Sequence, residues 1–227
     1  MYLKKIPGLL QRYLGGYRWR YETSEPVLYL TFDDGPTPEI TEWVMDQLAA
    51  YCAKATFFLV GNNVPPNAGI VHELLDSGHR IGNHTQTHRD GYKSSLRAYL
   101  RDFLRCQQTI FEYTGYQARL FRPPYGRLTQ TKARYIARTH EIVMMDVIAG
   151  DFDPTLTGEA CFQHVASHAR PGSIVLLHDS MKAWPRLSVA LPLILSHFAQ
   201  QGYRFEAIPQ GQEPRRLLPA PSRHRGY

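Results

Sequence analysis

Residues 27–36 read VLYLTFDDGP, an apolar run that ends abruptly in two aspartates, a glycine and a proline. Apolar and β-favouring residues without polar alternation predict a strand that is buried on both faces of a parallel sheet. The Gly-Pro pair then ends the strand. Asp33 and Asp34 therefore fall at the carboxyl end of a buried strand, where functional residues gather in parallel α/β folds.

Strand-like and helix-like segments alternate along the chain. The strand-like segments are residues 27–32, 55–60, 79–84, 120–123, 141–146, 172–178 and 204–208. The helix-like segments are residues 39–51, 69–78, 95–113, 131–140, 158–169 and 187–201. Pro192 lies inside the last segment, so that helix is expected to begin near this proline or to kink there. The alternation predicts an α/β fold with a parallel sheet, which either closes into a barrel or stays open and doubly wound.

The bulk composition is ordinary for a soluble globular protein, with 43% hydrophobic and 20% charged residues. No repeat or linker interrupts residues 26–209, which are expected to form one domain. Apolar runs are shorter than the roughly 18–20 residues of a membrane-spanning helix, and the N-terminus lacks the pattern of a secretory signal. We therefore expect a cytoplasmic protein in which Cys52, Cys106 and Cys161 are buried, reduced thiols.

The net charge of +6 is concentrated at the two ends of the chain. Residues 1–21 carry five basic side chains and no acid, and residues 210–227 carry four arginines and one glutamate. We expect residues 1–25 to be a basic amphipathic extension, either lying on a membrane surface or packed against the domain, and residues 210–227 to be a flexible tail. The body carries no basic stripe or motif that predicts nucleic-acid binding.

Polar residues follow most of the other predicted strands. They are Asn83, His84 and His88 after the third strand, Arg122 and Tyr125 after the fourth, Asp146 and Asp151 after the fifth, and His178 and Asp179 after the sixth. Because the carboxyl ends of parallel strands share one rim, we expect these side chains to converge there.

The His84–His88 spacing suits a metal site. On a helix, residues four apart share one face, so that two imidazoles can bind one ion. A carboxylate as third ligand leaves a position open for water, as in catalytic metal sites. The chain has a second pair with this spacing, His164 and His168, but no carboxylate at a strand end stands beside it, and we interpret it as a pair of helix-surface histidines.

Five segments are similar, in order, to the motifs of the polysaccharide deacetylases, the NodB-homology or carbohydrate esterase family 4 domain. They are TFDDGP (31–36), HTQTH (84–88), RPPYG (122–126), Asp151-Phe152 with Asp146 upstream, and Leu176-Leu177-His178. The resemblance spans residues 27–208. It implies a distorted (β/α)7–8 barrel and a hydrolase that removes N-acetyl groups from an amino-sugar polymer, oligosaccharide or glycan precursor.

The resemblance also implies a role for each residue of the site. One divalent metal ion, Zn²⁺ in the usual case, would be held by Asp34, His84 and His88. Asp33 would be the general base and His178 the catalytic acid. Arg122 would orient Asp33, Asp151 would hold His178, and the backbone N–H of Tyr125 would bind the oxyanion.

The fourth motif departs from the family, which often has tryptophan where this chain has Phe152. Met145 stands where many members have an aromatic residue, and the resemblance implies that both positions shape the groove for sugar rings, so these departures concern the substrate more than the catalytic chemistry. Phe152, Leu176 and Trp184 are candidates for the substrate groove, and core packing is an equal interpretation for Trp184. Two other functions stay open: an O-acetyl esterase that uses the same metal site, and a catalytically inactive carbohydrate-binding protein.

Overall fold

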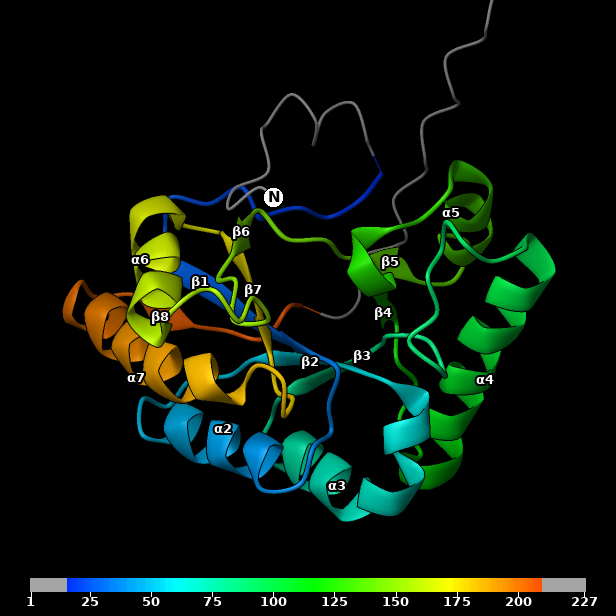
Figure 1. Cartoon of the computed structure of the whole chain (residues 1–227), viewed down its shortest axis with the longest axis horizontal. Coiled ribbons are helices and arrows are strands. Elements are labelled where there is room, and N and C mark those ends of the chain that lie inside the picture. Colours follow the sequence, from blue (N-terminus) through cyan, green and yellow to red (C-terminus); the bar gives the residue numbers. More distant parts are fainter. Residues whose placement is uncertain (1–15, 210–227) are drawn as a thin grey trace, which may run out of the picture.

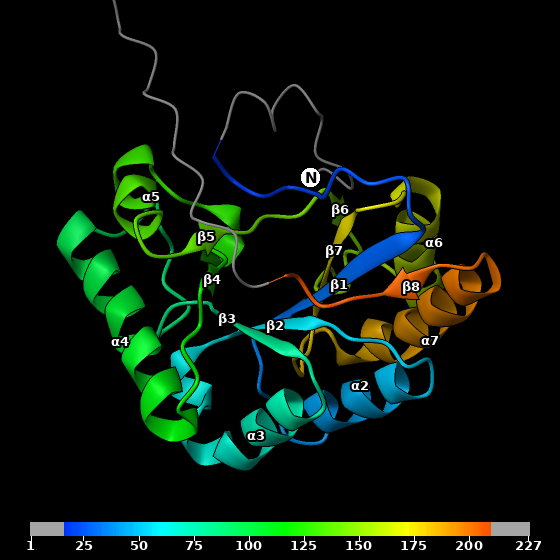
Figure 2. The ribbon, with the colours of Figure 1, turned by 180° about the vertical axis from the view of Figure 1, so that it is seen from behind.

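The computed structural model describes residues 16–209, which form a curled parallel sheet surrounded by helices (Figures 1 and 2). The strands are β1 (Val27–Asp33), β2 (Thr56–Leu59), β3 (Arg80–Asn83), β4 (Leu120–Phe121), β5 (Glu141–Ile142), β6 (Val147–Ile148), β7 (Ile174–His178) and β8 (Arg204–Phe205). Their spatial order is β5-β4-β3-β2-β1-β7-β6, and β8 pairs with β1. The α/β prediction is confirmed in its barrel form, distorted and incompletely closed.

Helices follow most of the strands and cover the outside of the sheet (Figure 1). They are α2 (Ile40–Ala49), α3 (Ala68–Asp76), α4 (Leu96–Thr114), α5 (Gln130–Ile136), α6 (Gly158–His168) and α7 (Trp184–Gln200), with short 3-10 turns η1 (Gly61–Asn63), η2 (Pro65–Asn67) and η3 (Pro124–Gly126). Helix α7 begins at Trp184 and includes Pro192, so the expected start near this proline is wrong.

Strand β1 explains how the core and the site are separated. Successive side chains of a strand point to opposite faces of the sheet. Leu28, Leu30 and Phe32 join the apolar layer beneath the outer helices, whereas Val27 and Tyr29 join a second apolar cluster on the other face. Thr31 and Asp33 continue the row of Val27 and Tyr29, which places a carboxylate on the inner face at the carboxyl end of the strand.

The predicted strand at 141–146 is wrong as a single element. Its residues divide between β5 and a loop that leads to β6, and these two strands lie at opposite ends of the sheet order. Asp146 holds this loop in place, because its carboxylate accepts hydrogen bonds from the Ser173 hydroxyl and the Ile174 N–H, both at 2.9 Å. These bonds tie the loop to β7. The loop therefore crosses the opening of the barrel, the gap between the edge strands β5 and β6.

Residues 16–21 cross that opening. Arg18 forms a β-bridge with Val143, and Arg20 forms one with Ser173. The Arg18 guanidinium makes a buried ion pair of 2.6 Å with Glu141, and Tyr17 and Trp19 are buried in the inner cluster. The packed body therefore begins upstream of the boundary expected at residue 26. The predicted N-terminal helix lies largely outside the described residues, and the predicted tail at residues 210–227 lies wholly outside them.

Two further observations bear on the sequence expectations. Cys106 and Cys161 are buried and reduced, as expected, but Cys52 is exposed because it lies in the turn after α2. Within residues 16–209, each helix is too short or too polar to cross a bilayer.

Candidate active site

Arg122 is the centre of the buried part of the site. Its side chain is fully buried, and one Nη donates 2.8 Å hydrogen bonds to the Thr31 hydroxyl and to Asp33 Oδ1. The other donors reach the carbonyl oxygens of Val143 and Met144 at 3.3 and 3.0 Å. The guanidinium also lies 4.2 Å from the centre of the Phe58 ring. Each of the three guanidinium nitrogens has at least one acceptor, so Arg122 is fixed and holds the Asp33 carboxylate in one orientation.

Asp34, His84 and His88 offer three ligand atoms that all lie within 4.8 Å of one another. Asp34 Oδ1 is 3.2 Å from Nε2 of His88 and 3.9 Å from Nε2 of His84. Asp34 has a positive φ of 83°, and its carbonyl accepts a 2.8 Å bond from the Asn63 amide. Two imidazole nitrogens and one carboxylate oxygen at this separation suit one divalent ion with bonds of about 2.0–2.2 Å.

The protonation of His84 fits this interpretation. Burial lowers the pKa of His84 to about 3, with His88 as a further lowering cause, so the ring is neutral at pH 7. Its Nδ1 lies 2.7 Å from the Arg122 carbonyl oxygen, which can only accept a hydrogen bond. The ring hydrogen is therefore on Nδ1, and the lone pair of Nε2 faces Asp34 and His88, the tautomer that a metal ligand needs.

The helical geometry expected for the histidine pair is wrong. Residues 84–88 form a loop with positive φ at Thr85 and His88, of 66° and 52°. Asp102 of α4 holds this loop by accepting bonds from the Thr87 N–H and hydroxyl, each 3.0 Å long. The two rings still converge, with centres 5.1 Å apart.

His178, which is half-buried, and the buried Asp151 form a second charged pair at the site. His178 Nδ1 lies 2.8 Å from Asp151 Oδ1, and the His178 backbone N–H donates to the second carboxylate oxygen at 2.7 Å. Burial alone would lower the pKa of His178, but the charge and hydrogen bond of Asp151, with smaller effects of Asp34 and Asp33, raise it to about 9. His178 is therefore an imidazolium at neutral pH.

Tyr125 lies beside the metal ligands. It adopts a left-handed conformation, with φ 60° and ψ 11°, inside η3. Its ring packs edge-on against His88, with centres 4.6 Å apart, and its hydroxyl is 3.2 Å from His88 Nδ1. The sequence pointed to the backbone N–H of Tyr125 for the oxyanion and to its ring for stacking on a sugar, so the contact between its side chain and His88 is additional.

These groups open into one cavity of about 740 Å³. Phe152 and Leu176 line it as predicted, and the Phe152 ring packs edge-on against His178 with centres 5.3 Å apart. Trp184 is not among its lining residues. It packs edge-on against Trp43 of α2, with ring centres 5.0 Å apart, a position that favours core packing for Trp184.

Sequence reasoning missed part of the cavity wall. Tyr17, Trp19 and Met144 line the cavity without having been predicted there, beside Met145, whose position the family resemblance had assigned to the groove. The crossing residues 16–21 were interpreted as part of the N-terminal extension, and their only signal was three aromatic residues, Tyr17, Trp19 and Tyr21, close before the first strand.

Asp179 was noted at a strand end but given no role. It is fully buried and accepts a 3.1 Å bond from the Gly35 N–H and a 2.6 Å bond from the Thr41 hydroxyl. Burial raises the pKa of Asp179 to about 8. A Cβ at Gly35 would lie 2.0 Å from Asp179 Oδ2, so the Asp33-Asp34-Gly35 turn can sit on this carboxyl only because residue 35 is glycine.

The second histidine pair is separate from this site. His164 Nδ1 contacts the Ala149 carbonyl at 3.1 Å, and His168 Nδ1 contacts the His164 carbonyl at 2.8 Å. His164 is buried rather than on the helix surface, which corrects that expectation. Of the described residues, only Asp34, His84 and His88 form a cluster with ligand atoms close enough for a metal.

A parallel α/β barrel with an Asp-His-His cluster and two charged pairs at the carboxyl ends of its strands defines a class of barrel hydrolases. The chain belongs to the polysaccharide deacetylase family, whose sequence model matches residues 20–145. The resemblance found in the sequence is thereby confirmed.

Individual relatives agree with this assignment. The chain is 35% identical over 196 residues to a peptidoglycan-N-acetylglucosamine deacetylase of Bacillus cereus, an alignment that covers 86% of this chain and 92% of that protein. The structure is similar to that of the Bc1960 peptidoglycan N-acetylglucosamine deacetylase, with a TM-score of 0.82 and 27% identity, covering 92% of this chain and 100% of the other. It is also similar to a family 4 acetyl xylan esterase from Clostridium thermocellum in complex with a cobalt ion, with a TM-score of 0.73 and 32% identity, covering 79% of this chain and 86% of that one.

Proposed function

We propose that this protein removes N-acetyl groups from an amino-sugar glycan, with a divalent metal ion held by Asp34, His84 and His88. The observation that carries the proposal is that an anionic and a cationic side chain line the same cavity. Beside the metal cluster, this cavity holds both a carboxylate fixed by Arg122 and an imidazolium fixed by Asp151. Amide hydrolysis needs both, a base for water and an acid for the leaving amine.

The base in this proposal is Asp33. Oδ1 of Asp33 accepts a hydrogen bond from Arg122, whereas Oδ2 lies 3.7 Å from His84 Nε2 and so faces the metal ligands. From this position Oδ2 takes a proton from the water whose oxygen bonds to the acetyl carbon. When bound, the metal ion supplies Lewis-acid polarisation of the acetyl carbonyl. The left-handed turn at Tyr125 supports the proposal that its backbone N–H binds the oxyanion.

The acid is His178. Its proton passes to the amide nitrogen as the bond between that nitrogen and the acetyl carbon breaks. The products are then acetate and a free amino sugar, and the proton that Asp33 removed restores the imidazolium. We assign Leu176 and Phe152 to the contact with the acetyl methyl group, because both are apolar and Phe152 lies against the His178 ring.

The ion in this proposal is Zn²⁺, the usual choice for imidazole and carboxylate ligands in a catalytic site. The cobalt ion in the similar acetyl xylan esterase supports a site that takes divalent transition metals. The glycan in this proposal is an N-acetylglucosamine polymer, oligosaccharide or precursor, in line with the name of the Bacillus cereus relative.

One alternative has its own observation. Because the acetyl xylan esterase has a similar fold, O-acetyl hydrolysis at the same metal site is a second candidate. A catalytically inactive binding protein is disfavoured, since Asp33, Arg122, His178 and Asp151 all take positions that suit hydrolysis.

Acetate release tests the proposal. The zinc-loaded protein is incubated with N-acetylglucosamine oligomers, with peptidoglycan and with acetylated xylan, and free acetate is measured. We expect release from an N-acetylated substrate and loss of at least about 100-fold in His178→Ala, because general acid catalysis contributes roughly 10²–10⁴-fold. Release from xylan alone would favour the esterase, and no release from any substrate by the metal-loaded protein would contradict both.

A further inference from the structure

Helix α4 presents a basic and apolar surface outside the barrel. Its inner face packs Tyr99, Phe103, Cys106 and Ile110 into the core. Its outer face carries Arg97, Arg101 and Arg105, which follow one another at four-residue spacing and so form one row. Together with Tyr135 of α5, this row lines a shallow hollow of about 780 Å³. The α4–α5 surface is defined here by its lining residues, Leu96, Arg97, Leu100, Arg101, Leu104, Arg105, Gln108 and Tyr135.

The positive charge of the α4–α5 surface is not neutralised by the rest of the described chain. No acidic side chain lines the hollow, and none of its three arginines forms an ion pair with a described residue. Asp102, the acid in the middle of α4, turns inward and binds the loop that carries the metal ligands. Arg138 adds a further positive charge at the edge, 4.8 Å from the centre of the Tyr135 ring.

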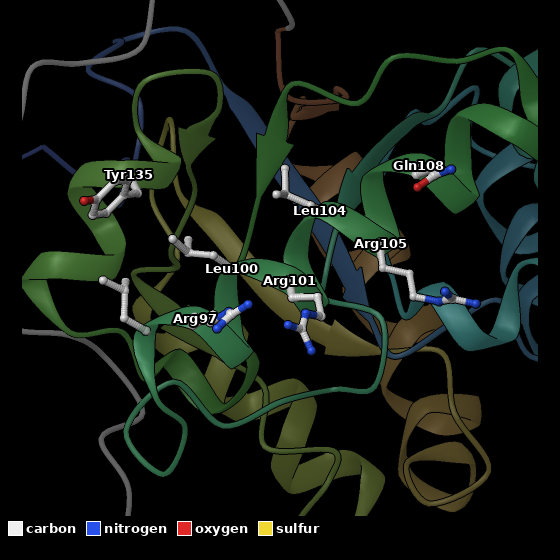
Figure 3. A pocket seen from close by; sticks show the side chains of 8 residues that line it. Arg97, Leu100, Arg101, Leu104, Arg105, Gln108 and Tyr135 are labelled. Carbon is white, nitrogen blue, oxygen red and sulfur yellow. The ribbon is translucent and has the colours of Figure 1, made fainter.

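Apolar side chains lie beside these charges. Leu104 is 61% exposed and Tyr135 is 45% exposed. Figure 3 shows Leu100 and Leu104 beside the row of Arg97, Arg101 and Arg105 on α4, with Tyr135 on the neighbouring helix. Exposed leucine costs free energy in water unless a partner covers it.

We propose that the α4–α5 surface docks the protein on an anionic lipid bilayer. Arginines would contact phosphate and other acidic headgroups, and Leu100, Leu104 and Tyr135 would enter the boundary between headgroups and acyl chains. This arrangement of a charged row beside an apolar row is that of helices that lie in a membrane interface. A nucleic acid would satisfy the arginines but would leave the leucines exposed to water, so the apolar half of the surface favours lipid.

The test is vesicle co-sedimentation of the full chain. Vesicles of phosphatidylcholine alone are compared with vesicles that contain phosphatidylglycerol as well. Each arginine near an anionic surface contributes about 1 kcal/mol, or about fivefold in partitioning. We therefore expect Arg101→Glu/Arg105→Glu to reduce binding to the anionic vesicles by at least about 20-fold. Leu104→Ser is expected to reduce it about threefold or more through the lost apolar contact.

The matched control is Arg80→Glu/Arg170→Glu, which changes the net charge equally at exposed arginines on other elements. It is expected to bind the anionic vesicles within about twofold of the wild type, and thermal unfolding checks that all variants are folded. The proposal is overturned if the wild type does not prefer anionic vesicles. It is also overturned if both double variants lose binding equally, because net charge or the basic ends would then be responsible. A Leu104→Ser variant that binds as wild type would remove the lipid assignment and leave a polyanion such as nucleic acid.

Discussion

Replacing Asp151 with asparagine is expected to move the alkaline limit of activity. The carboxylate is fully buried and contacts both the ring and the backbone N–H of His178. Burial lowers the pKa of His178, and Asp151 is the largest cause that raises it, to about 9. Asparagine keeps the size of the side chain but removes the charge, so the pKa of His178 is expected to fall to its ordinary value of 6.5 or below.

The magnitude follows from that change. A fall of about 2.5 pKa units corresponds to about 3.4 kcal/mol between the two protonation states of His178. A group with a raised pKa holds its proton below that pKa and loses it above. At pH 8 most His178 rings are therefore protonated in the wild type, but only about 3% are with a pKa of 6.5, which predicts an activity about 30-fold lower. A bound cation lowers the pKa in both proteins, so the difference between them is the sharper prediction.

The assay is the pH profile of kcat/KM for acetate release. The wild type is expected to lose activity only at alkaline pH, and Asp151→Asn is expected to lose it at least two pH units earlier, with recovery towards pH 6. Asp153→Asn makes the same chemical change two residues away and serves as the control, with thermal unfolding as a check of the fold. An alkaline limb that stays in place in Asp151→Asn would refute the assignment of His178 as the acid.

Four further predictions concern stability and geometry. Arg122→Met is expected to lower the free energy of unfolding by about 3–5 kcal/mol in urea titrations, because Asp33 is left buried without its cation; an unchanged midpoint would contradict the interpretation. Gly35→Ala places a Cβ 2.0 Å from Asp179 Oδ2, so kcat in acetate release is expected to fall at least about tenfold as the Asp33-Asp34 turn shifts; wild-type kcat would show that the turn adapts. Asp179→Ala leaves the Gly35 N–H and the Thr41 hydroxyl without their acceptor, which costs about 2–4 kcal/mol by thermal or chemical unfolding, whereas Asp179→Asn, which resembles the protonated carboxyl, is expected to cost less. Trp184→Leu is expected to lower the melting temperature, because Trp43 loses the ring that packs against it. The KM for acetate release is expected to stay within about twofold, and a large rise in KM would show that Trp184 contacts the substrate.

Much of the fold could be predicted from the sequence, because strand-like and helix-like segments alternate clearly along the chain. The buried strand at residues 27–32 continues by one residue to Asp33, and seven of the eight observed strands fall inside or overlap predicted segments. The division of residues 141–146 could not be predicted. It depends on the long-range bonds of the Asp146 carboxylate to Ser173 and Ile174, which no local pattern records.

The site was predictable in its composition but not in its local geometry. Asp34, His84 and His88 do meet, but a loop with left-handed residues brings the histidines together, where the spacing suggested a helix. Trp184 was a reasonable groove candidate as an aromatic residue near His178, yet its partner Trp43 lies far away in sequence. Tyr17 and Trp19 were missed because a crossing segment is recognised only once the opening of the barrel is seen. The cytoplasmic location and the roles of residues 1–15 and 210–227 stay predictions.

Metal content per chain tests the central claim most directly. The wild type, His84→Ala/His88→Ala and the control His164→Ala/His168→Ala are loaded with Zn²⁺, freed of excess metal and measured by elemental mass spectrometry, with thermal unfolding to confirm the fold. The control pair has the same spacing but stands apart from the Asp34 cluster. We predict about one ion per chain in the wild type and the control, and none in His84→Ala/His88→Ala. An equal metal content in all three proteins, or none in the wild type, would contradict a catalytic site built on Asp34, His84 and His88.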